Sequence, residues 1–161
     1  MNDIKKVTRR EFMITTTAVV SGVCLCGLEG CSIFSHYGDT PAINPEAYEI
    51  QDLTKTIGIF LDKAPDLLNE GYAVKIIDSR LKEPLIIANT GDDCFKAFPI
   101  TCTHNNYEVE YKHDKKEFRC INISHSKFST DGTVTFGPAD RPLTPYPIHR
   151  QGNNLMISLV G

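Results

Sequence analysis

The chain has 161 residues, of which 41% are hydrophobic and 23% are charged, and its formal net charge is −3. This length suits one ordinary globular domain and excludes two large ones. Residues 1–31 hold 4 basic and 3 acidic side chains, which leaves 13 basic and 17 acidic residues for the remainder. The clustered excess of basic residues that nucleic-acid binding requires is absent, so we predict no nucleic-acid partner.

The N-terminus has the layout of an export signal. A basic stretch at residues 5–10 leads into residues 12–28, which carry no charge and are rich in Val, Ala, Thr, Gly and Cys. Within the basic stretch, Arg9-Arg10 is followed at two residues by a phenylalanine, which resembles the twin-arginine export signal. We therefore predict that residues 1–31 are a signal or membrane anchor, and that the protein is exported to the periplasm or the outer face of the cytoplasmic membrane.

The end of this segment offers a second means of attachment. Residues 28–31 read Leu-Glu-Gly-Cys, which resembles a lipobox in which Cys31 becomes the lipidated first residue, although Glu29 departs from the usual pattern. The uncharged run of 17 residues is at the short limit for a transmembrane helix. Anchor and lipid both remain open, and either one holds the protein at a membrane.

Residues 32–47 contain Gly, Asp, Asn and Pro with little apolar periodicity, which is typical of a flexible tether. The domain is predicted to cover residues 48–161. Its short β-rich segments are, in chain order, residues 57–61, 73–78, 85–88, 94–98, 108–111, 117–120, 132–136 and 154–160.

Turns separate these segments. The residues 89–92 and 112–116 each join two of them into a hairpin, and residues 66–71 form a turn or a single helical turn. No long helical period follows the signal. We therefore predict an all-β domain of antiparallel sheets.

Two short motifs combine cysteine with histidine. Cys102-Thr103-His104 follows one predicted strand, and Cys120 begins a loop that contains His125. A hairpin between the motifs would bring both loops to the same end of a sheet. Thiolate and imidazole are the ligands that soft and borderline metals prefer, so these four residues admit either zinc or a Rieske cluster. Cys94, by contrast, is predicted to be a small apolar core residue.

Further motifs surround these residues in a fixed order. They are Phe118-Arg119-Cys120, Ser126-Lys127-Phe128, Asp131-Gly132, Gly137-Pro138-Ala139 and Arg141-Pro142-Leu143, preceded by the hairpin of residues 86–97. In this order and spacing the chain resembles the Rieske iron–sulfur domain family from about residue 49 to residue 161. The twin-arginine-like signal is consistent with this resemblance, since that route exports proteins that already hold their cofactor.

The resemblance implies a Rieske-like domain in which a hairpin-borne subdomain binds a [2Fe–2S] cluster. One iron is then held by Cys102 and Cys120, and the outer iron by His104 and His125. Ser126 matches the position whose hydroxyl donates to a cluster sulfide. Gly137 and Pro138 match the rigid loop that covers the cluster.

The second ligand loop departs from the family pattern. The family has Cys-x-x-His, whereas Cys120 and His125 are five positions apart, and Ile121 and Ser124 stand where the family has its ligands. Two alternatives therefore stay open: an exported Rieske-fold binding module that has lost the cluster, and a zinc site on the same four residues.

What the resemblance implies for function is electron transfer. The chain is predicted to be a component of an oxidoreductase and not an enzyme by itself, namely a subunit of a membrane-associated respiratory complex similar to quinol–cytochrome c reductase. Its expected partners are the membrane and cytochrome b- or c-type or other redox subunits. No hydrolase motif is present.

Overall fold

The structure is a computed structural model that describes residues 38–160. The regular secondary structure of these residues consists of β-strands and short 3-10 helices, which confirms the all-β prediction. The strands are β1 (Tyr48–Gln51), β2 (Thr56–Phe60), β3 (Ala73–Ile76), β4 (Leu85–Gly91), β5 (Cys94–Pro99), β6 (Val109–Lys112), β7 (Glu117–Cys120), β8 (Lys127–Ser129), β9 (Val134–Phe136), β10 (Ile148–Gln151) and β11 (Asn154–Ser158). The 3-10 helices are η1 (Pro45–Ala47), η2 (Pro65–Leu68) and η3 (His113–Lys115). The predicted signal or anchor helix and Cys31 lie outside the described residues.

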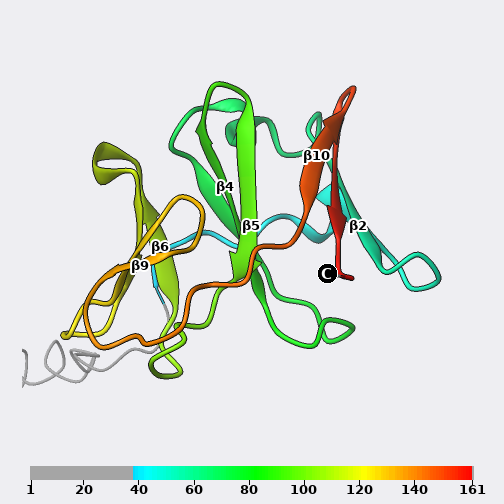
Figure 1. Ribbon diagram of the computed structural model, residues 1–161. Helices are drawn as coiled ribbons and strands as arrows, with labels where there is room; N and C mark the ends of the chain where they lie inside the picture. The colour runs from blue at the N-terminus through cyan, green and yellow to red at the C-terminus, as the bar shows by residue number, and fades with distance from the viewer. Residues whose placement is uncertain (1–37, 161) are drawn as a thin grey trace, which may run out of the picture. The chain divides into compact units, whose positions relative to one another are not determined.

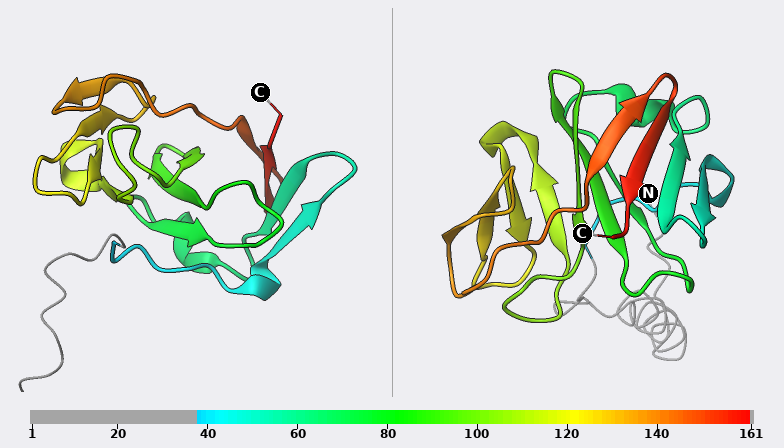
Figure 2. Two further views of the ribbon diagram at one scale, coloured as in Figure 1. Left: turned by 90° about the horizontal axis from the view of Figure 1, so that it is seen from below. Right: turned by 45° about the vertical axis from the view of Figure 1, so that its right-hand side comes forward.

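The strands are arranged in three antiparallel sheets. The base sheet has the order β1-β2-β11-β10, the middle sheet β3-β4-β5, and the site sheet β6-β7-β8-β9. Figures 1 and 2 show the middle sheet between the other two. The base sheet joins distant parts of the chain, because Thr56 in β2 lies opposite Ser158 in β11.

The middle sheet is buried on both faces because apolar side chains point to both sides of β4. Leu85 and Ile87 pack in one core cluster with residues of the base sheet, whereas Ile86 and Ala88 pack in the other with residues of the site sheet. A strand covered on both faces has a continuous apolar sequence and not an alternating one. The second cluster also contains Cys102 and Cys120, so these two predicted ligands belong to a packed core.

The two predicted hairpins are present. In the first, β4 extends to Gly91 and the turn is displaced to Asp92 and Asp93, whose φ angles are +53° and +56°. Aspartate tolerates this left-handed conformation better than most residues. In the second, β6 and β7 pair with Val109 opposite Cys120. Cys94 is exposed at the start of β5, so its prediction as a core residue is wrong.

The described part of the predicted tether packs against the domain. Ile43 and Ala47 are buried, and Ala42 forms a parallel bridge with Lys75 of β3. We call residues 38–43 the strap. Its single glycine and single proline resemble a linker in sequence, but its backbone groups bond to β3 and its one large apolar side chain, Ile43, is buried in the core.

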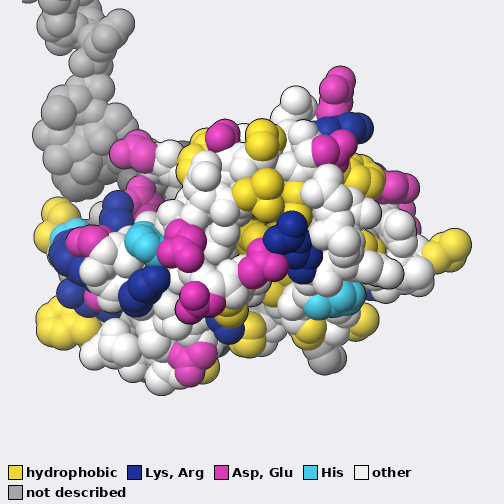
Figure 3. Space-filling view, turned by 90° about the horizontal axis from the view of Figure 1, so that it is seen from above, with side chains coloured by type: hydrophobic (Ala, Val, Ile, Leu, Met, Phe, Trp, Pro, Cys, Tyr) yellow, Lys and Arg dark blue, Asp and Glu magenta, His cyan; other side chains and the backbone are white. Residues whose placement is uncertain are grey.

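The surface has no large field of one charge on the face shown in Figure 3, where basic and acidic side chains are interspersed. Among residues 38–160, no helix is both long and apolar enough to cross a membrane.

Candidate functional site

Two loops meet at one end of the site sheet. The first loop, residues 102–107, is closed by a hydrogen bond of 2.8 Å from the Cys102 N–H to the Tyr107 carbonyl. The second loop, residues 121–126, is closed by a bond of 2.8 Å from the Cys120 N–H to the Ser126 carbonyl. Cys120 is the last residue of β7, and Cys102 directly follows the isolated bridge between Thr101 and Glu108. Because β6, which follows Glu108, pairs with β7, the two loops start side by side.

The two cysteines lie in contact and out of water. Cys102 is 3% exposed and Cys120 1% exposed, and their thiols share a hydrogen bond. This bond, assisted by the backbone N–H groups of His104 and Asn105, lowers the pKa of Cys102 to about 6 despite burial. Cys120 keeps the proton that it donates, so its pKa is raised. The N–H of Asn122 points at the Cys120 sulfur.

Ser126 provides a further hydrogen-bond donor beside the two thiols. It is 1% exposed, and its hydroxyl hydrogen-bonds to the Cys102 sulfur while its oxygen accepts the Ala139 N–H at 3.1 Å. Gly137 has a φ of +94°, and a Cβ atom added there would lie 2.7 Å from the Ser126 Cα. The chain at Gly137 therefore approaches Ser126 as closely as only glycine allows.

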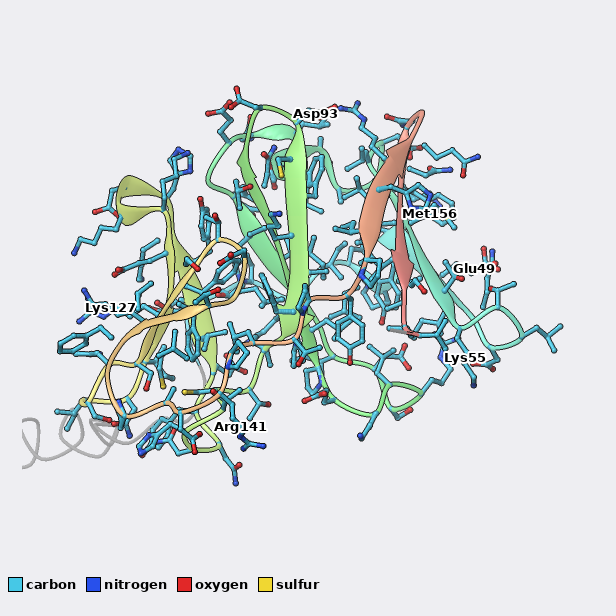
Figure 4. All side chains as sticks on the ribbon, viewed as in Figure 1. Glu49, Lys55, Asp93, Lys127, Arg141 and Met156 are labelled. Carbon is cyan, nitrogen blue, oxygen red and sulfur yellow. The ribbon has the colours of Figure 1, made fainter. Side chains whose placement is uncertain are left out.

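We call residues 137–142 the covering loop. Besides its contact with Ser126, it is fastened to the first loop, because the Thr103 hydroxyl donates to the Arg141 carbonyl at 2.7 Å and the Arg141 guanidinium donates to the Thr103 carbonyl at 3.4 Å. Arg141 marks this loop in Figure 4, at the same end as the two cysteine loops. An open polar hollow of about 400 Å³ adjoins it, and His104, Arg141 and Glu83 are among the residues that line it.

The two histidines are placed differently from the cysteines. His104 is exposed in the first loop. His125 is half-buried with a φ of +45°, and its Nδ1 lies 3.3 Å from the Cys120 carbonyl oxygen. Within residues 38–160, no group of three or more Cys, His, Asp or Glu side chains is gathered as a metal would require. The structure thus brings the two thiols together but does not bring the imidazoles to them.

The donor set nevertheless suits a group held by thiolates. The backbone N–H groups of His104, Asn105 and Asn122 and the Ser126 hydroxyl each act to lower the pKa of the cysteine beside them, since hydrogen bonds to sulfur stabilise its negative charge. The two imidazoles lie on the same loops as the thiols. The thiol half of the predicted ligand set is therefore assembled, whereas the imidazole half requires that His104 and His125 turn.

Sequence reasoning missed three residues at this site. The Asn105 Oδ1 lies 3.9 Å from the Cys120 sulfur and accepts the Tyr107 N–H. Glu108 and Lys75 form a buried ion pair. Asn105 follows a ligand motif and could have been considered from its position. Nothing in the sequence pairs residue 75 with residue 108, because the contact depends on how the sheets pack.

Comparison with known proteins finds matches among solved structures, whereas no family model and no curated protein matches the chain. The cyanobacterial plasma membrane Rieske protein PetC3 from Synechocystis PCC 6803 is 29% identical over 58% of this chain and 92% of its own, with a TM-score of 0.49. A chain in the complex of reduced oxygenase and oxidized ferredoxin in carbazole 1,9a-dioxygenase is 19% identical over 59% of this chain and 86% of its own, with a TM-score of 0.50. The fold is Rieske-like.

A further structure agrees with this assignment. A chain of the reduced complex between oxygenase and ferredoxin in carbazole 1,9a-dioxygenase is 17% identical over 66% of this chain and 28% of its own, with a TM-score of 0.51. At 17–19% identity the two dioxygenase matches concern the fold alone. One fold can serve many functions, so the function of this chain depends on the chemistry of its own residues.

Proposed function

We propose that this protein transfers electrons by means of a Rieske-type [2Fe–2S] cluster. The observation that carries the proposal is that Cys102 and Cys120 are both buried in one core cluster, at the starts of two adjacent loops, with backbone N–H groups and the Ser126 hydroxyl that lower the pKa of Cys102. A pair of thiols that only filled a core would not need these donors. The Rieske-like fold provides the support, since it presents the pair on two adjacent loops.

The proposed ligands are Cys102 and Cys120 for one iron and His104 and His125 for the other. The bound cluster supplies one-electron redox chemistry, and imidazole ligands raise its potential above that of an all-cysteine cluster. The protein's own groups hold the thiolates and limit access of water. The N–H groups and Ser126 stabilise the thiolate charge, and the covering loop, which includes Gly137 and Pro138, shields the sulfurs.

The proposal extends to location and partners. Residues 1–31 act as a twin-arginine-type signal or anchor, with Cys31 as the alternative site of lipid attachment, and residues 48–161 form the redox domain. The protein then works outside the cytoplasm at a membrane, as a subunit of a respiratory oxidoreductase. Cytochrome b- or c-type subunits are its proposed partners, and His104, which is exposed beside the thiols, lies at the end that would meet them.

The test is a metal analysis of protein purified without air. We expect equal amounts of iron and acid-labile sulfide, and a paramagnetic signal on reduction. Cys102→Ser should lose the iron, the sulfide and the signal. Cys94→Ser is the matched control because Cys94 is also a free cysteine but is exposed, away from the site, and this variant should keep all three.

The same analysis separates the alternatives. If zinc is the sole metal and Cys102→Ser loses it, the four residues form a zinc site and not a cluster site. Protein without any metal would indicate a Rieske-fold binding module that has lost its cluster. Either result contradicts the electron-transfer proposal.

A further inference from the structure

An ion pair lies buried where the middle sheet meets the site sheet. The Lys75 Nζ, on β3, is 3.0 Å from the Glu108 carboxylate, which precedes β6. Lys75 is 9% exposed and Glu108 is 6% exposed. Lysine and glutamate are seldom buried unless they are paired, and burying such a pair has a large desolvation cost. A contribution to stability alone therefore does not explain why Lys75 and Glu108 are buried here.

The strap closes over this pair. The Gly38 N–H donates to the Glu108 carboxylate at 2.7 Å, and the Lys75 ammonium donates to the Gly38 carbonyl at 3.4 Å. The strap is also bonded to the backbone of β3, because the Lys75 N–H donates to the Pro41 carbonyl and the Ile43 N–H donates to the Lys75 carbonyl. The Glu108 carboxylate and the Lys75 ammonium thus bind each other, and each also forms a hydrogen bond with the backbone of Gly38 in the strap.

The backbone of Glu108 connects both cysteine loops. Glu108 is paired with Thr101 in an isolated bridge at the base of the first loop. Its carbonyl accepts the N–H of Ile121, the first residue of the second loop, at 3.1 Å. One residue therefore contacts the first loop, the second loop and, through its side chain, Lys75 and the strap.

We propose that Glu108 is a positioning residue for the two thiols. Lys75 and the strap hold the Glu108 side chain, and its backbone thereby fixes the base of the first loop relative to the start of the second. The contact between Cys102 and Cys120 then depends on a charge pair that touches neither sulfur. This inference goes beyond the proposed function, since it concerns the thiol geometry whether or not a cluster binds.

The experiment uses the full-length protein in its metal-free form. Alkylation is followed by mass spectrometry of individual peptides, with the exposed Cys94 as an internal reference. In Glu108→Ala, we expect Cys102 and Cys120 to react faster relative to Cys94 by on the order of tenfold or more, because the carboxylate that accepts from both the Lys75 ammonium and the Gly38 N–H is removed. Lys75→Arg, which keeps the cation, should retain rates near those of the unmodified protein.

Hydrogen exchange distinguishes positioning from general stability. In Glu108→Ala, peptides that contain Val109 and Ile121 should exchange faster, whereas the peptide of residues 153–159 in the base sheet should not change. Asp78→Ala is the matched control, since it removes a carboxylate from an ion pair with the exposed Arg80 and from a hydrogen bond with Tyr48, and it should leave the alkylation of both thiols unchanged.

Two results would overturn the proposal. One is unchanged alkylation of Cys102 and Cys120 in Glu108→Ala. The other is an equal rise of exchange in all peptides, because that would be loss of global stability. If Glu108→Ala does not fold, Glu108→Gln is measured instead, because it keeps the side-chain shape and removes the charge. The same two results would then overturn the proposal. Iron content plays no part in these measurements, so their outcome is independent of the test for the cluster.

Discussion

Replacing Gly137 by alanine should open the covering loop. Gly137 has a φ of +94°, and an alanine Cβ there would lie 2.7 Å from the Cα and 3.0 Å from the N of Ser126. Both contacts are with backbone, which cannot rotate away as a side chain would. Gly152, in the turn between β10 and β11, is the matched control, because its φ is +61° and no atom lies within 4 Å of its added Cβ.

The two substitutions differ mainly in this overlap. A left-handed alanine costs about 1–2 kcal/mol, and the stiffer unfolded chain returns about 0.4–1 kcal/mol. Gly152→Ala should therefore lower the free energy of unfolding by about 0–1.6 kcal/mol. Gly137→Ala adds overpacking against a buried residue, which costs about 1–3 kcal/mol, so its total loss of unfolding free energy should be about 1–4.6 kcal/mol, which is about 1–3 kcal/mol more than in Gly152→Ala.

Denaturant unfolding of the metal-free protein measures both values, and alkylation of Cys102 reports on the loop itself. Gly137→Ala should expose Cys102 and reduce the iron retained by protein purified without air, whereas Gly152→Ala should do neither. Equal losses of unfolding free energy in the two variants would refute the reasoning, because the close approach to Ser126 would then have no energetic effect.

Three other predictions concern the ligand loop, export and pH. His125→Ala should lose iron, whereas Ser124→Ala should keep it, and retention of iron with an unchanged spectrum in His125→Ala would remove His125 from the ligand set. Replacing Arg9 and Arg10 together by lysine should leave the protein in the cytoplasm on cell fractionation, and normal export of that variant would exclude a twin-arginine signal. The hydrogen bonds from Arg80 lower the pKa of Asp78 in the folded protein. They therefore stabilise the folded state fully above the unfolded-state pKa of about 4, and this stabilisation is lost as the pH falls through the lower pKa of the folded state. The difference in unfolding free energy between the protein and Asp78→Asn should therefore shrink in acid, and a difference independent of pH would contradict this assignment.

The sequence predicted most strands because burial leaves a clear pattern. The residues 85–88 and 117–120 are β-rich and flanked by turns, and both predictions agree with β4 and β7. The strands β1, β8 and β10 were not predicted. Of these, β10 shows the reason: it lies at the edge of the base sheet and reads Ile-His-Arg-Gln, with one apolar residue in four. An edge strand with little burial carries no periodic signal.

At the site, the spacing of Cys102 and Cys120 around a hairpin anticipated that the two residues would meet. The role of the backbone could not be predicted, since the N–H groups of His104, Asn105 and Asn122 donate to sulfur whatever their side chains are. The orientation of the His125 ring toward the Cys120 carbonyl depends on the positive φ of His125, which the sequence of the loop does not specify.

The strand order of the base sheet has a consequence for how the chain assembles during synthesis. In the middle and site sheets, each strand pairs with a neighbour in the chain, so these pairings span few residues. The base sheet instead places β11 between β2 and β10, and the partner of Thr56 is Ser158. Long-range pairings of this kind form late because they require the closure of a long loop. The site sheet therefore needs no strand beyond β9, whereas the base sheet can close only after β11 has left the ribosome.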